Sequence, residues 1–113
     1  MAKKNHREVC GLLIDSGYAI ELVPVRNTFR GPGRFIFDSR QVRRLQRAAS
    51  VLGHETVGTY HSHPVGSAHP GRSDLMTATL DDSLLLIIDC LGREALLWHI
   101  KDRKARAVRY ELC

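Results

Sequence analysis

The chain has 113 residues, of which 43% are hydrophobic and 26% charged, and its formal net charge is +5. These values fit one globular domain, residues 1–113, with a core of its own, and they exclude a disordered, collagen-like or coiled-coil chain. The longest aliphatic run, residues 84–88, is far too short to span a membrane and no secretory signal is visible, so we expect a cytoplasmic protein.

The first third of the chain predicts strands separated by turn residues. Apolar and β-branched residues at 9–14 and 18–25 predict a hairpin, because the Asp-Ser-Gly cluster at 15–17 favours a turn between them. Residues 26–34 are rich in glycine and other breakers of regular structure. The aromatic and aliphatic residues at 35–37 then predict a third, short strand.

A helix is predicted after Asp38, which with Ser39 supplies an N-cap, and Gly53 ends it. The apolar residues that recur at helical spacing are Val42, Leu45, Ala48, Ala49 and Leu52. The outer face carries Arg40, Arg43, Arg44 and Arg47. Such a basic stripe is typical of a solvated surface and also of a binding surface, and the sequence leaves both open.

The second half predicts a strand at 56–62, an irregular loop at 64–71 and a second helix that ends before the strand 84–89. Two more strands are predicted, at 95–100 and 105–112. The whole chain is therefore one α/β or α+β unit of about seven strands and two helices.

The residues with most chemical information are His61 and His63, followed by Asp74. Residues two apart in a strand share a face, so both imidazoles can converge on one ion while Ser62 points the other way. A carboxylate from the next helix would complete three protein ligands and leave a fourth position open, which is the pattern of catalytic zinc. The alternative is a structurally hydrogen-bonded histidine pair with Asp74 as a helix cap.

The sequence contains neither of two other common zinc-binding motifs, and it offers two glutamates as candidate general bases. An H-E-x-x-H motif starting at His54 would need histidine where Gly58 stands, and the chain has no C-x-x-C pair. Glu55 lies six residues of extended chain from His61, about 20 Å, which is too far for proton transfer. Glu8, at the start of a predicted strand, is a candidate base, although a solvated edge charge is the simpler interpretation.

The combination of E-V-C-G-L-L from Glu8, H-S-H-P from His61 and Asp74 resembles the JAMM (MPN-plus) metalloprotease family in its compact prokaryotic form. Asp74 stands eleven positions after His63, where the family has its third ligand. The resemblance covers nearly the whole chain. It implies a mixed, curved central sheet flanked by helices and one Zn²⁺ per chain.

In this family the residue roles carry over position by position. The resemblance implies that His61, His63 and Asp74 bind zinc, and that Glu8 acts as general base and then general acid. It implies hydrolysis of a peptide or isopeptide bond after the tail of a ubiquitin-like or sulfur-carrier protein. His69, in the loop beside the site, is a candidate substrate contact.

One position departs from the family, because Gly71 stands where a serine that helps to stabilise the oxyanion is expected. Loss of such a donor typically costs about 10² to 10³ in rate. Either Gly71 caps the second helix and Asp74 keeps the family geometry, or Ser73 caps it and Asp74 is rotated. The oxyanion role would then fall to the metal, to water, or to Ser62 or Ser73 after rearrangement.

The partners and the alternative functions follow from these features. A non-catalytic binding module of the same fold is the alternative to an enzyme, because of Gly71. Nucleic acid is a less favoured partner, since a net charge of +5 also suits an acidic carrier protein. From the resemblance we expect the N-terminal helix of many family members to be absent or truncated here, which would expose apolar surface, and both a monomer and a homodimer are compatible with this.

Overall fold

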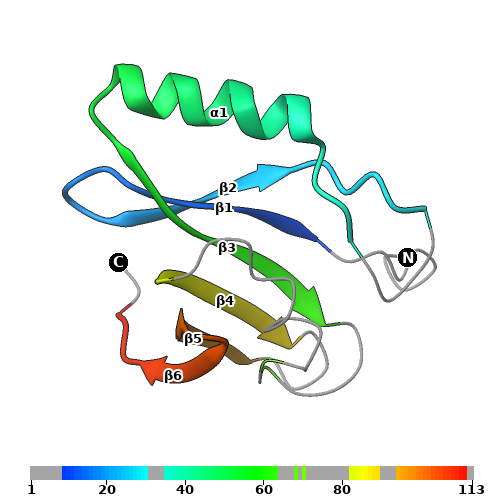
Figure 1. The fold of residues 1–113 in the computed structure, drawn as a ribbon, viewed down its shortest axis with the longest axis vertical. Coiled ribbons are helices and arrows are strands. Elements are labelled where there is room, and N and C mark those ends of the chain that lie inside the picture. The colour runs from blue at the N-terminus through cyan, green and yellow to red at the C-terminus, as the bar shows by residue number, and fades with distance from the viewer. Residues whose placement is uncertain are drawn as a thin grey trace.

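The computed structural model describes residues 9–30, 35–63, 68, 70, 82–89 and 94–111. They form a single compact α/β domain, in which one helix packs on a six-stranded sheet of order β2-β1-β3-β4-β5-β6 (Figure 1). The elements are β1 (Cys10–Asp15), β2 (Ile20–Val25), α1 (Ser39–Val51), β3 (Glu55–His63), β4 (Ser83–Asp89), β5 (Glu94–Lys101) and β6 (Lys104–Val108). Only β3 and β4 run parallel, and the other neighbouring strands are antiparallel. The expected mixed sheet is confirmed.

Helix α1 forms where its local signals predict it. The carboxylate of Asp38 accepts hydrogen bonds from the backbone N–H groups of Arg40, at 3.1 Å, and Gln41, at 3.3 Å. These bonds satisfy two of the donors that every helix N-terminus leaves free. The helix ends at Val51, and Leu52 is its C-cap. Gly53 follows with a φ of +75°, a conformation that glycine adopts without strain.

The prediction of a strand at residues 35–37 is wrong, because this segment forms only an isolated β-bridge, between Asn27 and Phe37. The side-chain oxygen of Asn27 accepts the backbone N–H groups of Phe29, at 2.9 Å, and Ile36, at 3.0 Å. The Asn27 side chain thus takes the Ile36 N–H that a regular ladder would give to a backbone carbonyl, although the Ile36 carbonyl still accepts the Thr28 N–H at 2.8 Å. The second predicted helix lies outside the described residues.

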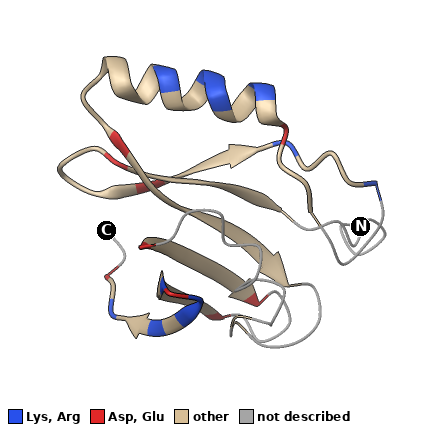
Figure 2. Cartoon of the chain, viewed as in Figure 1, with Lys and Arg blue, Asp and Glu red and all other residues tan. Residues whose placement is uncertain are grey.

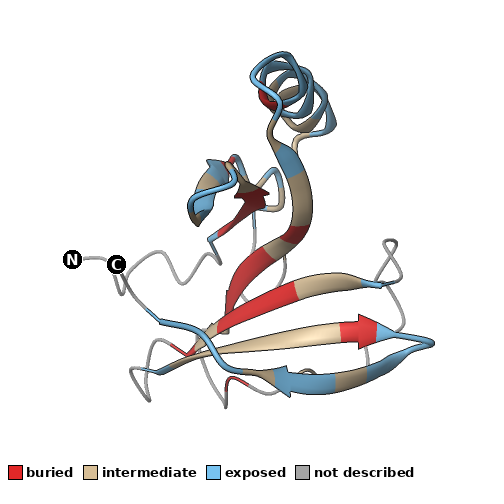
Figure 3. Cartoon of the chain, turned by 90° about the vertical axis from the view of Figure 1, so that its left-hand side faces the viewer, coloured by how far each residue is buried: buried red, intermediate tan, exposed pale blue. Residues whose placement is uncertain are grey.

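The core consists of three clusters that follow the alternation of side chains along the strands. On the face that α1 covers, Leu12, Ile14 and Val25 pack with Ala49. Farther along the sheet, Ala68, Leu85, Ile87 and Ile100 form a second cluster. Leu13, Tyr60 and Leu86 form the third. Figure 3 shows these buried positions along the middle of a curved sheet whose outer strands are more exposed.

Gly58, at the beginning of the β3–β4 pairing, has no room for a side chain, since an ideal Cβ would lie 2.0 Å from the carbonyl oxygen of Leu84. We expect Gly58→Ala to lower the free energy of unfolding by about 3 kcal/mol, because the β4 backbone must move. Urea denaturation measures this loss. The control is Gly53→Ala, where nothing lies within 4 Å and only the positive φ opposes alanine, at about 1 kcal/mol. Equal losses would contradict the contact argument.

Some apolar side chains of the edge strand β2 are exposed, including Ile20 at 41% and Leu22 at 47%. A second copy of the chain could cover them, and the homodimer stays a prediction that light scattering can test. No helix among the described residues is long and apolar enough to cross a bilayer.

Candidate metal centre

His61 and His63 lie at the carboxyl end of β3, next to the parallel strand β4 (Figure 1). Their side chains lie on the same face, as the strand alternation predicts, and their Nε2 atoms are 3.1 Å apart. The His61 ring is buried, with 3% exposure, while His63 is half-buried. The pair therefore has one anchored imidazole and one that reaches the surface.

This separation fits a shared zinc ion. Two nitrogens bound to zinc at about 2.0 to 2.1 Å with a tetrahedral angle lie about 3.3 Å apart, close to the distance found between the two Nε2 atoms. In the free protein the same distance allows one ring to donate an N–H to the other, with the direction set by the tautomers. The donor set is thus suitable for zinc and stable without it.

Phe35 fixes the orientation of the His61 ring. The two rings stack with their centroids 4.7 Å apart and an angle of 25° between their planes, and Phe37 packs edge-on against Phe35 at 5.2 Å. This contact joins the segment before α1 to the end of β3. Sequence analysis assigned Phe35 no role beyond that of a strand residue, because a contact across 26 positions leaves no local pattern.

Ser62 points away from the histidines and holds the segment before β1. Its hydroxyl oxygen accepts a hydrogen bond from the backbone N–H of Val9 at 2.9 Å, and its own N–H donates to the Val9 carbonyl at 3.0 Å. Ser62 is 3% exposed. These two bonds place Val9 directly beside the strand segment that carries both histidines.

Two further polar residues lie on the histidine face. Asp89, the last residue of β4, is the register partner of His63 and is 5% exposed. Cys10 is the register partner of His61, and its thiol donates to the Val25 carbonyl at 3.5 Å. Sequence analysis assigned Asp89 no role. The signal that could have identified it is an acidic residue at the end of an otherwise aliphatic strand. Within the described ranges, no group of three histidine, cysteine or acidic side chains is arranged to hold a metal.

Tyr60 belongs to the core rather than to the site. Its ring lies over Gly11, where an ideal Cβ would meet the Tyr60 ring at 2.2 Å. Burial raises the pKa of the Tyr60 hydroxyl above its ordinary value, and the nearby Cys10 thiol raises it further. The hydroxyl therefore stays protonated at neutral pH and is no candidate for a base.

The remaining predicted site residues are outside the part of the chain that the structure describes. They are Glu8, His69, Gly71, Ser73 and Asp74. The structure brings His61 and His63 together and places Ser62 behind them. The third ligand, the base and the substrate contact stay predictions.

Comparison with known proteins finds a family and relatives for the chain. A family model described as prokaryotic homologs of the JAB domain matches residues 1–108. CysO-cysteine peptidases of Mycobacterium bovis and Mycobacterium tuberculosis are 30% identical over 91 residues, which is 77% of this chain and 62% of theirs. The chain thus spans about three fifths of the length of these curated relatives.

Two solution structures have the same fold. A protein from Desulfitobacterium hafniense superimposes with a TM-score of 0.76 and 25% identity, over 91% of this chain and 76% of that protein. A protein from Salinibacter ruber gives a TM-score of 0.60 and 24% identity, over 94% of this chain and 76% of that one. The second likeness concerns the fold alone.

Proposed function

Because the chain belongs to the prokaryotic JAB (JAMM/MPN) domain family, we propose that it is a zinc-dependent hydrolase of peptide or isopeptide bonds. Its bond is the one that follows the C-terminal tail of a ubiquitin-like or sulfur-carrier protein. The observation that carries the proposal is the pair of converging imidazoles of His61 and His63, whose Nε2 atoms are 3.1 Å apart. A histidine pair with this separation is suited to zinc. Both imidazoles come from the single strand β3, so the pair forms without the help of another strand or helix.

The residues have distinct tasks in this reaction. His61, His63 and Asp74 hold the zinc ion. A zinc ion held by these residues would supply Lewis-acid chemistry, polarising the scissile carbonyl and making water more acidic. Glu8 accepts a proton from the attacking water and returns it to the leaving amine, so one carboxylate serves first as base and then as acid.

The Ser62 bonds support the role of Glu8. Glu8 directly precedes Val9 in the chain, and Val9 is held on both its N–H and its carbonyl by Ser62, between the two histidines. A carboxylate on the neighbouring residue starts from a fixed backbone beside the site. We infer that Ser62 is a positioning residue, because it holds the backbone of Val9, to which Glu8 is covalently bonded.

We expect Ser62→Ala to lower kcat about tenfold and the free energy of unfolding by about 1 kcal/mol, because the Val9 N–H loses its acceptor. Zinc affinity should stay unchanged, since the histidines point to the other face. Steady-state kinetics, urea denaturation and zinc titration measure the three quantities. Ser16→Ala, which removes a hydroxyl bonded to the Ala19 carbonyl in the β1–β2 turn, is the control and should leave kcat unchanged. A fall in zinc affinity with unchanged kcat would contradict the positioning role.

The substrate class is supported by the curated relatives, which are named CysO-cysteine peptidases. A small carrier protein with an extended tail suits a site at the end of a strand, where a narrow chain can reach the histidines more easily than a folded domain can. The net charge of +5 suits an acidic carrier.

A non-catalytic binding module is the second candidate, and Gly71 favours it. Glycine lacks the hydroxyl that family members use on the oxyanion, a loss typically worth about 10² to 10³ in rate. In this case the fold is kept, and the surface recruits a partner without cutting it.

The test of the proposal uses the zinc-loaded protein and a ubiquitin-like carrier whose C-terminal Gly-Gly tail is extended by a short peptide. Intact-mass analysis should detect the carrier ending at Gly-Gly, and a chelator should stop its release. The same carrier without Gly-Gly is the control and should stay intact. Absence of cleavage while zinc is bound would reject the hydrolase and favour the binding module.

A further inference from the structure

The exposed side of α1 carries four arginines, Arg40, Arg43, Arg44 and Arg47, which we name the arginine face. Their spacing of i, i+3, i+4 and i+7 places them on one side of the helix. Val42, Leu45 and Ala49, on the opposite side, pack against the sheet. Figure 2 shows the basic positions as successive bands along α1. The arginine face therefore points away from the domain into solvent.

This arrangement works against the stability of the helix. Arg40 and Arg44, and likewise Arg43 and Arg47, are like charges four residues apart, which repel each other. Beyond the N-cap carboxylate of Asp38, the first turn contains no acidic residue, so Arg40 stands near the positive end of the helix dipole. None of the four side chains makes an ion pair within the part of the chain that the structure describes. A local rule broken without an internal gain indicates an external partner.

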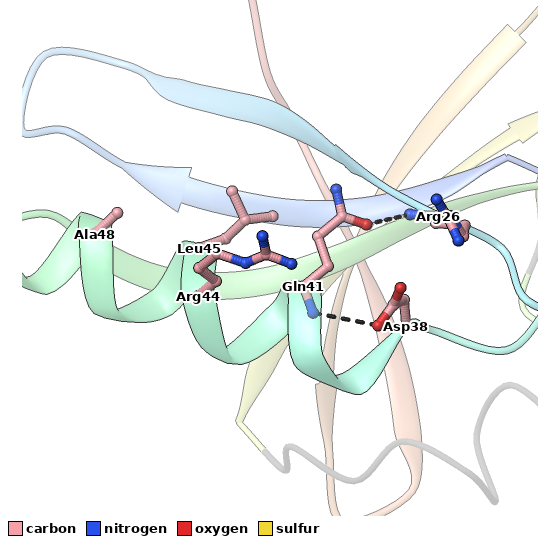
Figure 4. Close-up of a pocket in the computed structure, with 6 residues that line it drawn as sticks. All are labelled: Arg26, Asp38, Gln41, Arg44, Leu45 and Ala48. Carbon is pink, nitrogen blue, oxygen red and sulfur yellow. Dashed lines mark hydrogen bonds between the residues drawn. The ribbon is translucent and has the colours of Figure 1, made fainter.

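A groove beside the arginine face adds apolar surface. It has a volume of about 440 Å³ and lies between α1 and the segment that follows β2, and Figure 4 shows its lining. Its lining residues are Arg26, Asp38, Gln41, Arg44, Leu45 and Ala48. The side-chain oxygen of Gln41 accepts the backbone N–H of Arg26 at 2.7 Å. Oδ1 of Asp38 caps the helix, and the Asp38 carboxylate is the one negative charge among these lining residues.

Arg26 and Arg44 remain as cations on the rim of the groove, and Leu45 and Ala48 supply its apolar part. Arg44 belongs to both surfaces, so the groove and the arginine face are continuous.

We propose that the arginine face and this groove bind an acidic polypeptide that also presents apolar side chains. Arginine binds carboxylates through two parallel hydrogen bonds, and four exposed guanidinium groups can take several of them. Leu45 and Ala48 offer a small apolar surface next to the cations, which aliphatic side chains of a polypeptide can cover and phosphate groups cannot. We therefore favour a polypeptide over nucleic acid. The inference goes beyond the proposed hydrolysis and does not depend on it.

The chain offers a matched control surface. Lys101, Lys104 and Arg106 are exposed at the β5–β6 hairpin, and β6 is the edge strand opposite to β2. The triple variant Arg43→Gln, Arg44→Gln and Arg47→Gln removes three charges from the arginine face. The triple variant Lys101→Gln, Lys104→Gln and Arg106→Gln removes three charges elsewhere. All six side chains are exposed, and glutamine is a good helix former, so circular dichroism should report folded proteins.

The experiment measures fluorescence anisotropy of a labelled 20-residue peptide of glutamate and leucine at low salt. We expect the α1 variant to bind at least tenfold more weakly than wild type, and the hairpin variant to differ by less than twofold. A peptide with serine in place of leucine should bind more weakly than the leucine peptide. A DNA duplex of equal charge is the comparison probe.

Three results would overturn the proposal. The first is equal weakening by the two variants, which means general charge attraction. The second is that the DNA duplex binds more tightly than the peptide and that the α1 variant loses this DNA binding. The surface would then be a nucleic-acid site. The third is no binding of the leucine peptide by wild type. Because no arm measures cleavage, failure here leaves the hydrolase proposal unaffected, and the reverse holds as well.

Discussion

Glu8→Ala should lower the rate of carrier-tail hydrolysis by about 10² to 10⁴ and leave zinc affinity unchanged, because general acid–base catalysis contributes that much. The proposed task of Glu8 is to move a proton, and the proposed task of His61, His63 and Asp74 is to hold the ion. Rate and binding should therefore separate in this variant. Steady-state kinetics with the tailed carrier and competition titration with a chromogenic zinc chelator measure the two quantities.

Glu55→Ala is the matched control for Glu8. Glu55 is an exposed glutamate at the opposite end of the strand that carries the histidines, and its register partner is Asp15. Removing it subtracts the same charge and should leave the rate within about twofold, since it is too distant for proton transfer. Equal rates for wild type and Glu8→Ala would remove Glu8 from the reaction and leave the binding module as the better explanation.

Elements whose signals are local could be predicted from the sequence. Helix α1 follows from an N-cap at Asp38, an apolar period that packs on the sheet, and Gly53 past its end, and these signals lie within sixteen residues. The shared face of His61 and His63 is also local, because strand alternation fixes it whatever the strand pairs with.

Features that depend on distant pairing could not be predicted. The hydrogen bonds between Ser62 and Val9 join residues 53 positions apart. Asp89 comes next to His63 only because β4 pairs with β3 in one parallel register. Neither the pairing partner nor its register is visible in the pattern of a single strand. The sequence therefore located the imidazoles correctly and left the residues around them without roles.

The interrupted strand at residues 35–37 has a different cause. Its aromatic and aliphatic residues favour a strand, but the amide oxygen of Asn27 takes the Ile36 N–H and ends the ladder at one bridge. This irregular segment is also what brings Phe35 onto the His61 ring. Phe37 packs edge-on against Phe35, so the two rings together support the His61 imidazole.

Loss of one imidazole should abolish both zinc binding and hydrolysis. In His63→Ala only His61 remains of the pair, and we expect hydrolysis of the tailed carrier to fall by at least about 10³, since the Lewis acid supplies several kcal/mol. Zinc at 100 times its dissociation constant should stabilise wild type by about 2.7 kcal/mol and should not stabilise the variant. Urea denaturation with and without zinc measures the difference.

His63 is the better position for this test, because His61 is 3% exposed and stacks on Phe35, so its removal would also cost packing energy. The matched control is His99→Ala. His99 is a half-buried histidine of the same sheet, its Nε2 lies 2.6 Å from the Asp82 carboxylate, and its register partner is Leu84. Strand parity places it on the face opposite to the pair, so its loss should affect stability alike with and without zinc. Zinc stabilisation that survives in His63→Ala would mean that the two imidazoles do not share the ion, and the hydrolase proposal would lose the observation on which it rests.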